Sequence, residues 1–178
     1  MLVIDLETRP NPKLKKLFKA THPTVQDKDL HKAMATSTDF AEIVCIGIKQ
    51  VGGQTRVLSS IEELSTPEWN RILTQIPLIS YNGKRFDLPV IIKAGIKAGL
   101  NLPYARLSKA CKPWGYADRH IDLMEALSFN SRWESLDTML QIYLGIEKKT
   151  KGNDFFINAS AEALMKKSLP FVFFSIPK

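Results

Sequence analysis

The order of strand-like and helix-like segments constrains the fold of this chain most. Short runs of apolar and β-branched residues alternate with segments of helical composition, and the turn at residues 51–54 predicts a hairpin between the second and third runs. Three strands in a row, followed by strands that alternate with helices, indicate a sheet with mixed strand directions. The strands are expected at residues 2–6, 41–50, 55–59, 76–81 and 120–123. We therefore predict an α/β domain built on a mixed five-stranded sheet flanked by helices.

Capping residues mark several of the helices between these strands. Ser60 and Glu63 have the spacing of a capping box, and Thr66 before Pro67 predicts a helix that runs to about residue 74. Asp87 is expected to cap the helix that follows it. The helices are expected at residues 13–20, 27–36, 66–74, 87–99, 135–145 and 160–168.

Length and composition favour a single folded domain. The chain has 178 residues, of which 44% are hydrophobic and 24% charged, and these values are typical of folded proteins rather than of disordered or fibrous ones. We expect one domain over residues 1–168. Residues 169–176 are uncharged and rich in phenylalanine. We expect the segment 169–178 to be foreign to that domain, because the chain is truncated or altered in reading frame after about Lys167.

The charge balance indicates an anionic partner. Lysine and arginine total 25 against 18 aspartates and glutamates, which gives a formal net charge of +7 and a pI near 9.4. A positive field of this size favours polyanions. Nucleic acid is therefore the first partner to expect.

Cysteine usage and hydropathy argue against secreted and membrane proteins. Cys45 and Cys111 are the two cysteines of the chain and have no ligand spacing, so neither a disulfide framework nor a structural zinc is expected. No apolar run reaches the length of about 18 residues that a membrane helix requires, and the first residues lack the pattern of a signal peptide. We expect a cytoplasmic protein without a membrane partner.

Two acidic residues end the first expected strand. Asp5 and Glu7 are one residue apart, so alternation along a strand points both side chains to the same face, about 7 Å apart along the backbone. Two carboxylates in this arrangement can converge on one cation. A solvated pair at a strand end is the alternative that this motif alone leaves open.

A third carboxylate follows the fourth expected strand. In the segment Tyr81–Pro89, an Asn-Gly turn and two cations precede Asp87, which stands at the start of a helix. This place is at the C-terminal side of the sheet, where open α/β folds commonly build sites. A plain capping role for Asp87 stays open as the alternative.

Together these two segments resemble the DEDD superfamily of 3′-5′ exonucleases, which has a ribonuclease-H-like fold. Residues 3–8 (VIDLET) are similar to its first motif and residues 81–89 (YNGKRFDLP) to its second, in the branch similar to the proofreading domain of family B DNA polymerases. Residues 120–124 (HIDLM) and the helix that begins at residues 135–137 (SLD) also look like this branch. The resemblance therefore covers about residues 1–160.

The resemblance implies a metal-dependent 3′-5′ exonuclease that hydrolyses phosphodiester bonds in single-stranded or frayed DNA. Asp5, Glu7 and Asp87 would be its catalytic residues and would hold Mg²⁺ or Mn²⁺, with two ions in a complete site. One ion of such a pair serves the attacking hydroxide and the other the leaving oxygen. The implied setting is DNA replication or repair, with proteins of those processes as further partners.

The third motif of the family is not found. The helix expected at residues 160–168 has no tyrosine or histidine placed a few residues before an aspartate, so the fourth carboxylate is missing. Asp122 lies close to the expected site, but we favour for it the alternative role of hydrogen-bonding the backbone or orienting a neighbour. Two other functions therefore stay open: a nucleic-acid-binding module without activity on an exonuclease fold, and a ribonuclease-H-type endonuclease.

Four residues are candidates for contact with nucleic acid. Asn82, Lys84 and Arg85 lie in the second motif, where the two cations suit phosphate groups, although solvated surface charge is the alternative for each. Trp114 lies between a proline and a glycine on an expected loop and is placed to stack on an unpaired base. The sequence does not distinguish DNA from RNA and leaves the oligomeric state open.

Overall fold

The structure is a computed structural model that describes residues 1–112, 119–128 and 133–145. The chain divides into two compact units, residues 1–130 and 131–178. Every described strand lies in the first unit, and one described helix, α7 (Leu136–Leu144), lies in the second. The expectation of a single domain over residues 1–168 stays a prediction.

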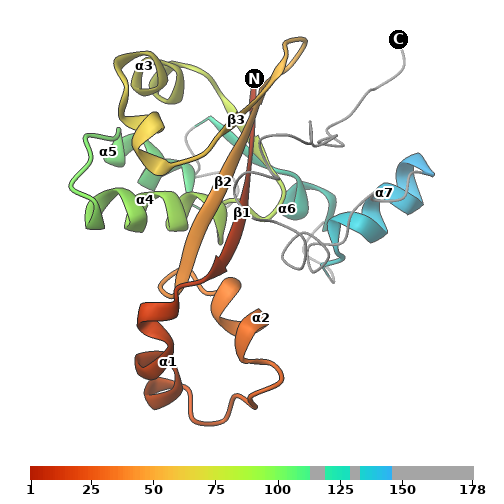
Figure 1. Ribbon diagram of the computed structural model, residues 1–178. Helices are drawn as coiled ribbons and strands as arrows, with labels where there is room; N and C mark the ends of the chain where they lie inside the picture. Colours follow the sequence, from red (N-terminus) through yellow and green to blue (C-terminus); the bar gives the residue numbers. More distant parts are fainter. Residues whose placement is uncertain (113–118, 129–132, 146–178) are drawn as a thin grey trace. The chain divides into compact units, whose positions relative to one another are not determined.

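A mixed five-stranded sheet forms the centre of the first unit (Figure 1). Its strands are β1 (Leu2–Pro10), β2 (Ala41–Gln50), β3 (Thr55–Leu58), β4 (Leu78–Ser80) and β5 (His120–Asp122). The strand order is β3-β2-β1-β4-β5, in which β1, β2 and β3 pair antiparallel and β4 and β5 continue the sheet in parallel. The predicted α/β architecture, a mixed five-stranded sheet flanked by helices, is confirmed.

Helices connect the strands and cover the sheet. In the first unit the described α-helices are α1 (Lys15–Thr21), α2 (Leu30–Ala35), α3 (Pro67–Gln75), α4 (Asp87–Lys97), α5 (Tyr104–Ala110) and α6 (Leu123–Ser128). Short 3-10 helices occupy Pro12–Leu14 and Ile61–Ser65. In the main hydrophobic core, side chains of β1 and β2 pack against those of α3, α4 and α5. Figure 1 shows these three helices on one side of β1 and β2.

Alternation along β1 sorts its side chains onto two faces. Leu2, Ile4 and Leu6 are buried in the main core. Asp5 and Glu7, between and beyond them, are half-buried and point to the opposite face. The strand therefore delivers two carboxylates on one face, as predicted.

The sequence signals for the element ends succeed in part. Ser60 and Glu63 form the predicted capping box, but the helix that they open is a 3-10 helix. Thr66 caps α3, where its hydroxyl accepts a hydrogen bond from Trp69 N at 3.4 Å. β1 runs four residues further than expected, because its pairing with β2 continues past a bulge after Glu7.

Two helices were not expected from the sequence. α5 has seven residues and α6 has six, and α6 starts directly after β5 without a loop. Segments this short carry too few turns for a periodic apolar pattern to emerge.

Among the described helices, none combines the length and the apolar character that crossing a bilayer demands.

Candidate active site

Asp87 reaches across to β1 instead of capping its own helix. The N-cap of α4 is Phe86, and Asp87 is the first residue of the helix. Its Oδ1 accepts a hydrogen bond from Leu6 N at 3.0 Å. The expectation that Asp87 caps α4 is therefore wrong, and the carboxylate lies against the stretch of β1 between Asp5 and Glu7.

The short length of β4 explains this contact. β4 ends at Ser80 and pairs with β1 only at Leu2 and Val3, so no strand residue faces Leu6 N on that side. A buried backbone N–H needs an acceptor, and the carboxylate of Asp87 supplies it. We call Asp5, Glu7 and Asp87 the carboxylate corner.

Electrostatics couples two members of the carboxylate corner. Burial raises the pKa of Asp87 well above its ordinary value, and the charge of Asp5 raises it further. The hydrogen bond from Leu6 N acts in the opposite direction but does not cancel these effects. Two carboxylates that raise each other's energy in a desolvated place are an arrangement that a cation relieves.

Cys45 reports the charges of the same corner. It lies on β2 opposite Glu7 in the strand register and is 4% exposed. Burial raises the pKa of the Cys45 thiol to about 11, with further contributions from the charges of Glu7 and then Asp5. The corner is therefore a region of negative potential that reaches across to the neighbouring strand.

The donor set fits a hard divalent cation in its chemistry. All three side chains offer carboxylate oxygens, which suit Mg²⁺ and Mn²⁺. The structure brings Asp5 and Asp87 into electrostatic contact and places Glu7 on the same face of β1. Within residues 1–112, 119–128 and 133–145, no three acidic, histidine or cysteine side chains converge closely enough to form a complete metal site.

The loop that leads from β4 to Asp87 has a constrained backbone. Asn82 has a φ of +64°, a left-handed conformation that asparagine tolerates better than most residues. A Cβ on Gly83 would clash with Ser80 Oγ, so only glycine fits there. The Asn-Gly pair of the second motif is thus explained by the turn itself.

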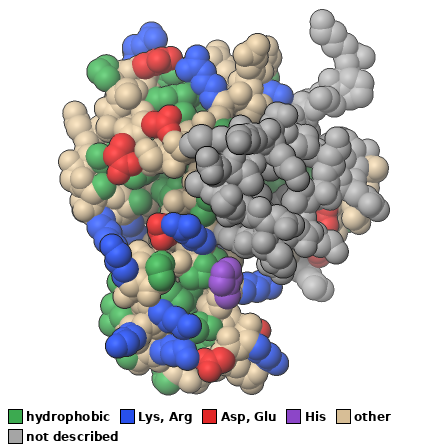
Figure 2. Space-filling model, viewed as in Figure 1, with side chains coloured by type: hydrophobic (Ala, Val, Ile, Leu, Met, Phe, Trp, Pro, Cys, Tyr) green, Lys and Arg blue, Asp and Glu red, His purple; other side chains and the backbone are tan. Residues whose placement is uncertain are grey.

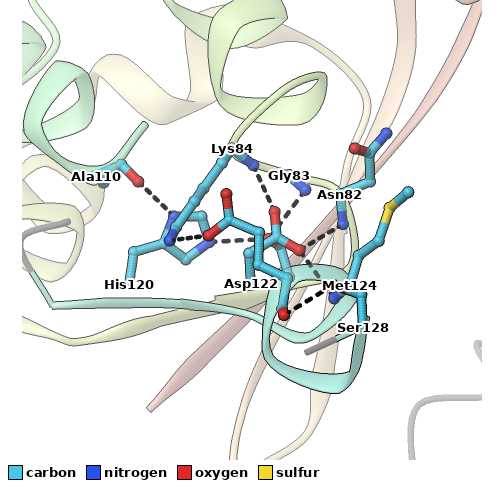
Figure 3. A network of polar contacts seen from close by, with 10 residues as sticks. Asn82, Gly83, Lys84, Ala110, His120, Asp122, Met124 and Ser128 are labelled. Atoms are coloured by element: carbon cyan, nitrogen blue, oxygen red, sulfur yellow. Dashed lines mark hydrogen bonds and ion pairs between the residues drawn. The ribbon is translucent and has the colours of Figure 1, made fainter. Parts of the chain in front are cut away.

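Asp122 fixes this loop from β5 (Figure 3). Its Oδ1 accepts hydrogen bonds from Asn82 N at 2.8 Å and Met124 N at 3.1 Å, and its Oδ2 accepts one from Lys84 N at 3.0 Å. The side chain is 1% exposed. These contacts are the backbone-binding role that the sequence favours for Asp122, and they make it a positioning residue for the loop that carries Asp87.

Lys84 turns inward, and the expectation that it contacts phosphate is corrected. Its side chain is 1% exposed, and its Nζ lies 2.7 Å from Glu125 Oε2 on α6 (Figure 3). A buried ammonium in an ion pair is not offered to a ligand from solvent. Arg85, the next residue, is exposed and keeps the expected position for such a contact.

His120 also supports this loop. Its Nδ1 lies 2.8 Å from the carbonyl oxygen of Ala110, so this nitrogen donates, and its Nε2 lies 2.8 Å from Ser80 Oγ. Ser80 Oγ also accepts a hydrogen bond from Gly83 N. Burial lowers the pKa of His120, which keeps the ring neutral in this chain of contacts.

Ser80 and Glu125 also support the site and were not predicted from the sequence. The sequence feature that could have indicated Glu125 is its position in the first turn of α6, directly after the strand that ends at Asp122. For Ser80 it is the position three residues before Gly83. Trp114 and the third-motif segment, including residues 160–168, lie outside the described residues, as does the segment 169–178.

A family model matches most of the chain. Its description is "predicted 3′-5′ exonuclease related to the exonuclease domain of PolB", and it matches residues 28–150. The matched range contains Asp87 and Asp122 and begins after Asp5 and Glu7. No curated protein sequence matches the chain.

Solved structures of exonuclease I are similar to this chain. A structure described as exonuclease I (apo) is 15% identical over 82% of this chain and 37% of its own, with a TM-score of 0.42. A product-bound structure of exonuclease I is 15% identical over 93% of this chain and 42% of its own, with a TM-score of 0.43. The chain thus spans less than half the length of these proteins. Because the family model covers well over half of its residues, the chain belongs to the predicted 3′-5′ exonucleases related to the exonuclease domain of PolB, and the resemblance to that branch is confirmed.

Proposed function

We propose that the chain is a metal-dependent 3′-5′ exonuclease that acts on single-stranded or frayed DNA through the carboxylate corner. Family membership supports the reaction class. The observation that carries the proposal is the position of Asp87, which is 5% exposed, bound to Leu6 N and repelled by the charge of Asp5. Buried carboxylates with strongly raised pKa values cluster at functional sites, which supports this role for Asp87.

Each part of the corner has a defined role in this proposal. Asp5 and Asp87, with Glu7 beside them, would hold Mg²⁺ or Mn²⁺, and the ion would supply charge stabilisation for the leaving oxygen and lower the pKa of an attacking water. Leu6 N holds Asp87 in place, so its carboxylate does not need to reorganise when the substrate arrives. Arg85 is exposed beside Asp87 in the sequence, so a phosphate contact is assigned to its guanidinium.

The test is release of mononucleotides from 5′-labelled single-stranded DNA in the presence of Mn²⁺. We expect stepwise shortening from the 3′ end by the wild-type chain and none by Asp5→Ala. Glu62→Ala is the matched control, because Glu62 is an exposed carboxylate on the 3-10 helix at Ile61–Ser65 and should leave the release unchanged.

The pattern of products separates the proposal from its rivals. Binding of DNA without any release, with every divalent ion tried, would reject the enzyme and favour a binding module. Linearisation of circular single-stranded DNA would reject exonuclease action and favour an endonuclease.

A further inference from the structure

The segment between β1 and β2 forms a separate small lobe. Residues 11–40, which we call the basic lobe, contain α1 and α2 and lie beyond the end of β1 and β2 in Figure 1. The lobe has its own hydrophobic cluster of Phe18, Leu30 and Met34, which is distinct from the main core. It is therefore a folded feature rather than a loose connection.

Lysines dominate the surface of this lobe. Its acidic residues are three aspartates, and two of them are already neutralised: Asp27 by Lys19 at 2.6 Å and Asp39 by Lys93 of α4 at 2.6 Å. Figure 2 shows the resulting concentration of blue side chains over the lobe. Within the described part of the chain, five exposed lysines of the lobe form no ion pair: Lys13, Lys15, Lys16, Lys28 and Lys32.

The basic lobe is fixed beside the carboxylate corner. Thr8, the residue after Glu7, donates a buried hydrogen bond from its hydroxyl to the carbonyl oxygen of Ala35 in α2 at 2.8 Å. Asn11 N donates to Phe40 O at 2.9 Å and closes the base of the lobe. The surplus positive charge therefore starts a few residues from the carboxylates and is held there by the fold.

A positive surface near the carboxylate corner would help the proposed reaction by attracting its polyanionic substrate. A polynucleotide is repelled by the carboxylates of the corner, and a nearby positive surface offsets that repulsion and raises the local concentration of the substrate.

The aromatic rings of Phe18 and Phe40 pack against each other inside the lobe, edge to face and with centroids 4.9 Å apart, so they do not serve as a surface for base stacking. Contact through lysines alone reads phosphate groups and carries no base specificity.

We propose that the basic lobe binds the phosphate backbone of the polynucleotide whose end enters the carboxylate corner. The inference rests on the proposed function for the identity of the polyanion. The lysines make sequence-independent contacts with phosphates on the strand that extends away from the reacting bond.

The experiment compares two triple variants with the same loss of charge. The lobe variant is Lys13→Ala, Lys16→Ala and Lys32→Ala, and the control variant is Arg71→Ala, Lys97→Ala and Lys109→Ala. All six residues are exposed and make no ion pair among the described residues, so both variants should fold, which far-ultraviolet circular dichroism checks. Affinity for a fluorescent oligothymidylate is measured by anisotropy in EDTA over a series of KCl concentrations.

We expect the lobe variant to lose about tenfold or more in affinity at low salt, and the slope of log affinity against log salt to fall by about 0.7 for each phosphate contact removed. The control variant should keep the wild-type slope. Equal losses in both variants would overturn the inference, because net charge alone would then explain binding. Equal retention of wild-type binding would overturn it as well.

Vesicle binding and nucleotide release distinguish this inference from a lipid-binding role and from the proposed exonuclease activity. If the wild-type chain binds vesicles of phosphatidylserine through Lys16 and the exposed Leu17, and oligothymidylate does not compete, the lobe is a lipid-binding surface and the inference is wrong. If the lobe variant loses binding in EDTA while the wild-type chain releases no nucleotide with Mn²⁺, the inference stands and the proposed exonuclease activity fails. If release proceeds with an unchanged KM in the lobe variant, the activity stands and the inference fails.

Discussion

Asp87 and Asp122 are both buried aspartates, yet the fold treats their charges in opposite ways. Asp122 accepts three backbone hydrogen bonds, from Asn82, Lys84 and Met124. Asp87 accepts one from another element, Leu6 N, and its pKa is raised by burial and then by the charge of Asp5. A carboxylate that accepts several hydrogen bonds stabilises the local fold, whereas one whose burial is poorly compensated lowers the stability of the fold.

The largest expected effect comes from Asp87→Asn. The amide oxygen still accepts from Leu6 N, but the negative charge is lost, so we expect exonuclease activity to fall at least about 100-fold. The free energy of unfolding should be unchanged or higher by about 1 kcal/mol, because a repelled buried charge has been removed. Chain shortening assays and urea unfolding at pH 7 measure the two quantities.

The pH dependence of the Asp87→Asn effect has a defined sign. The folded pKa of Asp87 lies above the ordinary 3.8, so its contribution to stability is fully present below that value and is lost as the pH rises through the folded pKa. The stability gained by Asp87→Asn over wild type should therefore grow from acid to neutral pH. A gain that shrinks over this range would contradict the contrast between the two aspartates.

Asp122→Ala should affect stability more than activity, the opposite of what we expect for Asp87→Asn. The change removes the acceptor of three backbone N–H groups, one in a buried and two in partly buried hydrogen bonds, so we expect a loss of about 3–5 kcal/mol in the free energy of unfolding. Activity should fall only as far as the loop carrying Asp87 loosens. Asp122→Asn, which keeps one acceptor oxygen, is the graded control and should lose less stability than Asp122→Ala in the same unfolding experiment.

Lys84 and Arg85 allow the same contrast between a buried and an exposed cation. Lys84→Met removes the partner of Glu125, whose side chain is 17% exposed, and should lower the free energy of unfolding by about 1–3 kcal/mol without changing the salt dependence of DNA binding. Arg85→Ala should cost less stability than Lys84→Met, because Arg85 is exposed, and should weaken binding by a few-fold. If Lys84→Met flattens the salt dependence while stability is kept, the inward position of Lys84 is refuted.

Local sequence patterns predicted the bounds of secondary-structure elements. They did not predict the position of a side chain whose partner is distant in the sequence. The bounds of β2 at residues 41–50 followed from its β-branched run and the Gly-Gly turn after it. The capping role of Asp87 was wrong because its hydrogen-bond partner, Leu6, is 81 residues away. Lys84 was misassigned for the same reason, since its partner Glu125 lies 41 residues further along the chain.

The candidate site divides in the same way. Alternation in a strand predicted the shared face of Asp5 and Glu7, which the structure confirms. No rule of local pattern brings Asp87 to the gap between them, because that depends on where β4 stops pairing with β1. The resemblance to a family supplied that link, while the roles of the three residues as metal ligands stay predictions.

The smallest expected effect is at Cys45. The charges of the carboxylate corner raise the pKa of its thiol, whereas Asp122 does not contribute to it. Its pKa of about 11 is raised by burial and then by Glu7, so Glu7→Gln should lower that pKa, yet leave it above 9 because burial persists. The rate of alkylation near pH 9, read by peptide mass spectrometry, should rise a few-fold at Cys45, since the thiolate is the reactive form. Cys111, also near 11 but raised by burial alone, is the internal control and should not respond. An equal rise at both cysteines would mean that Glu7→Gln loosens the fold, and no rise at Cys45 would mean that Glu7 does not act on the corner as a charge.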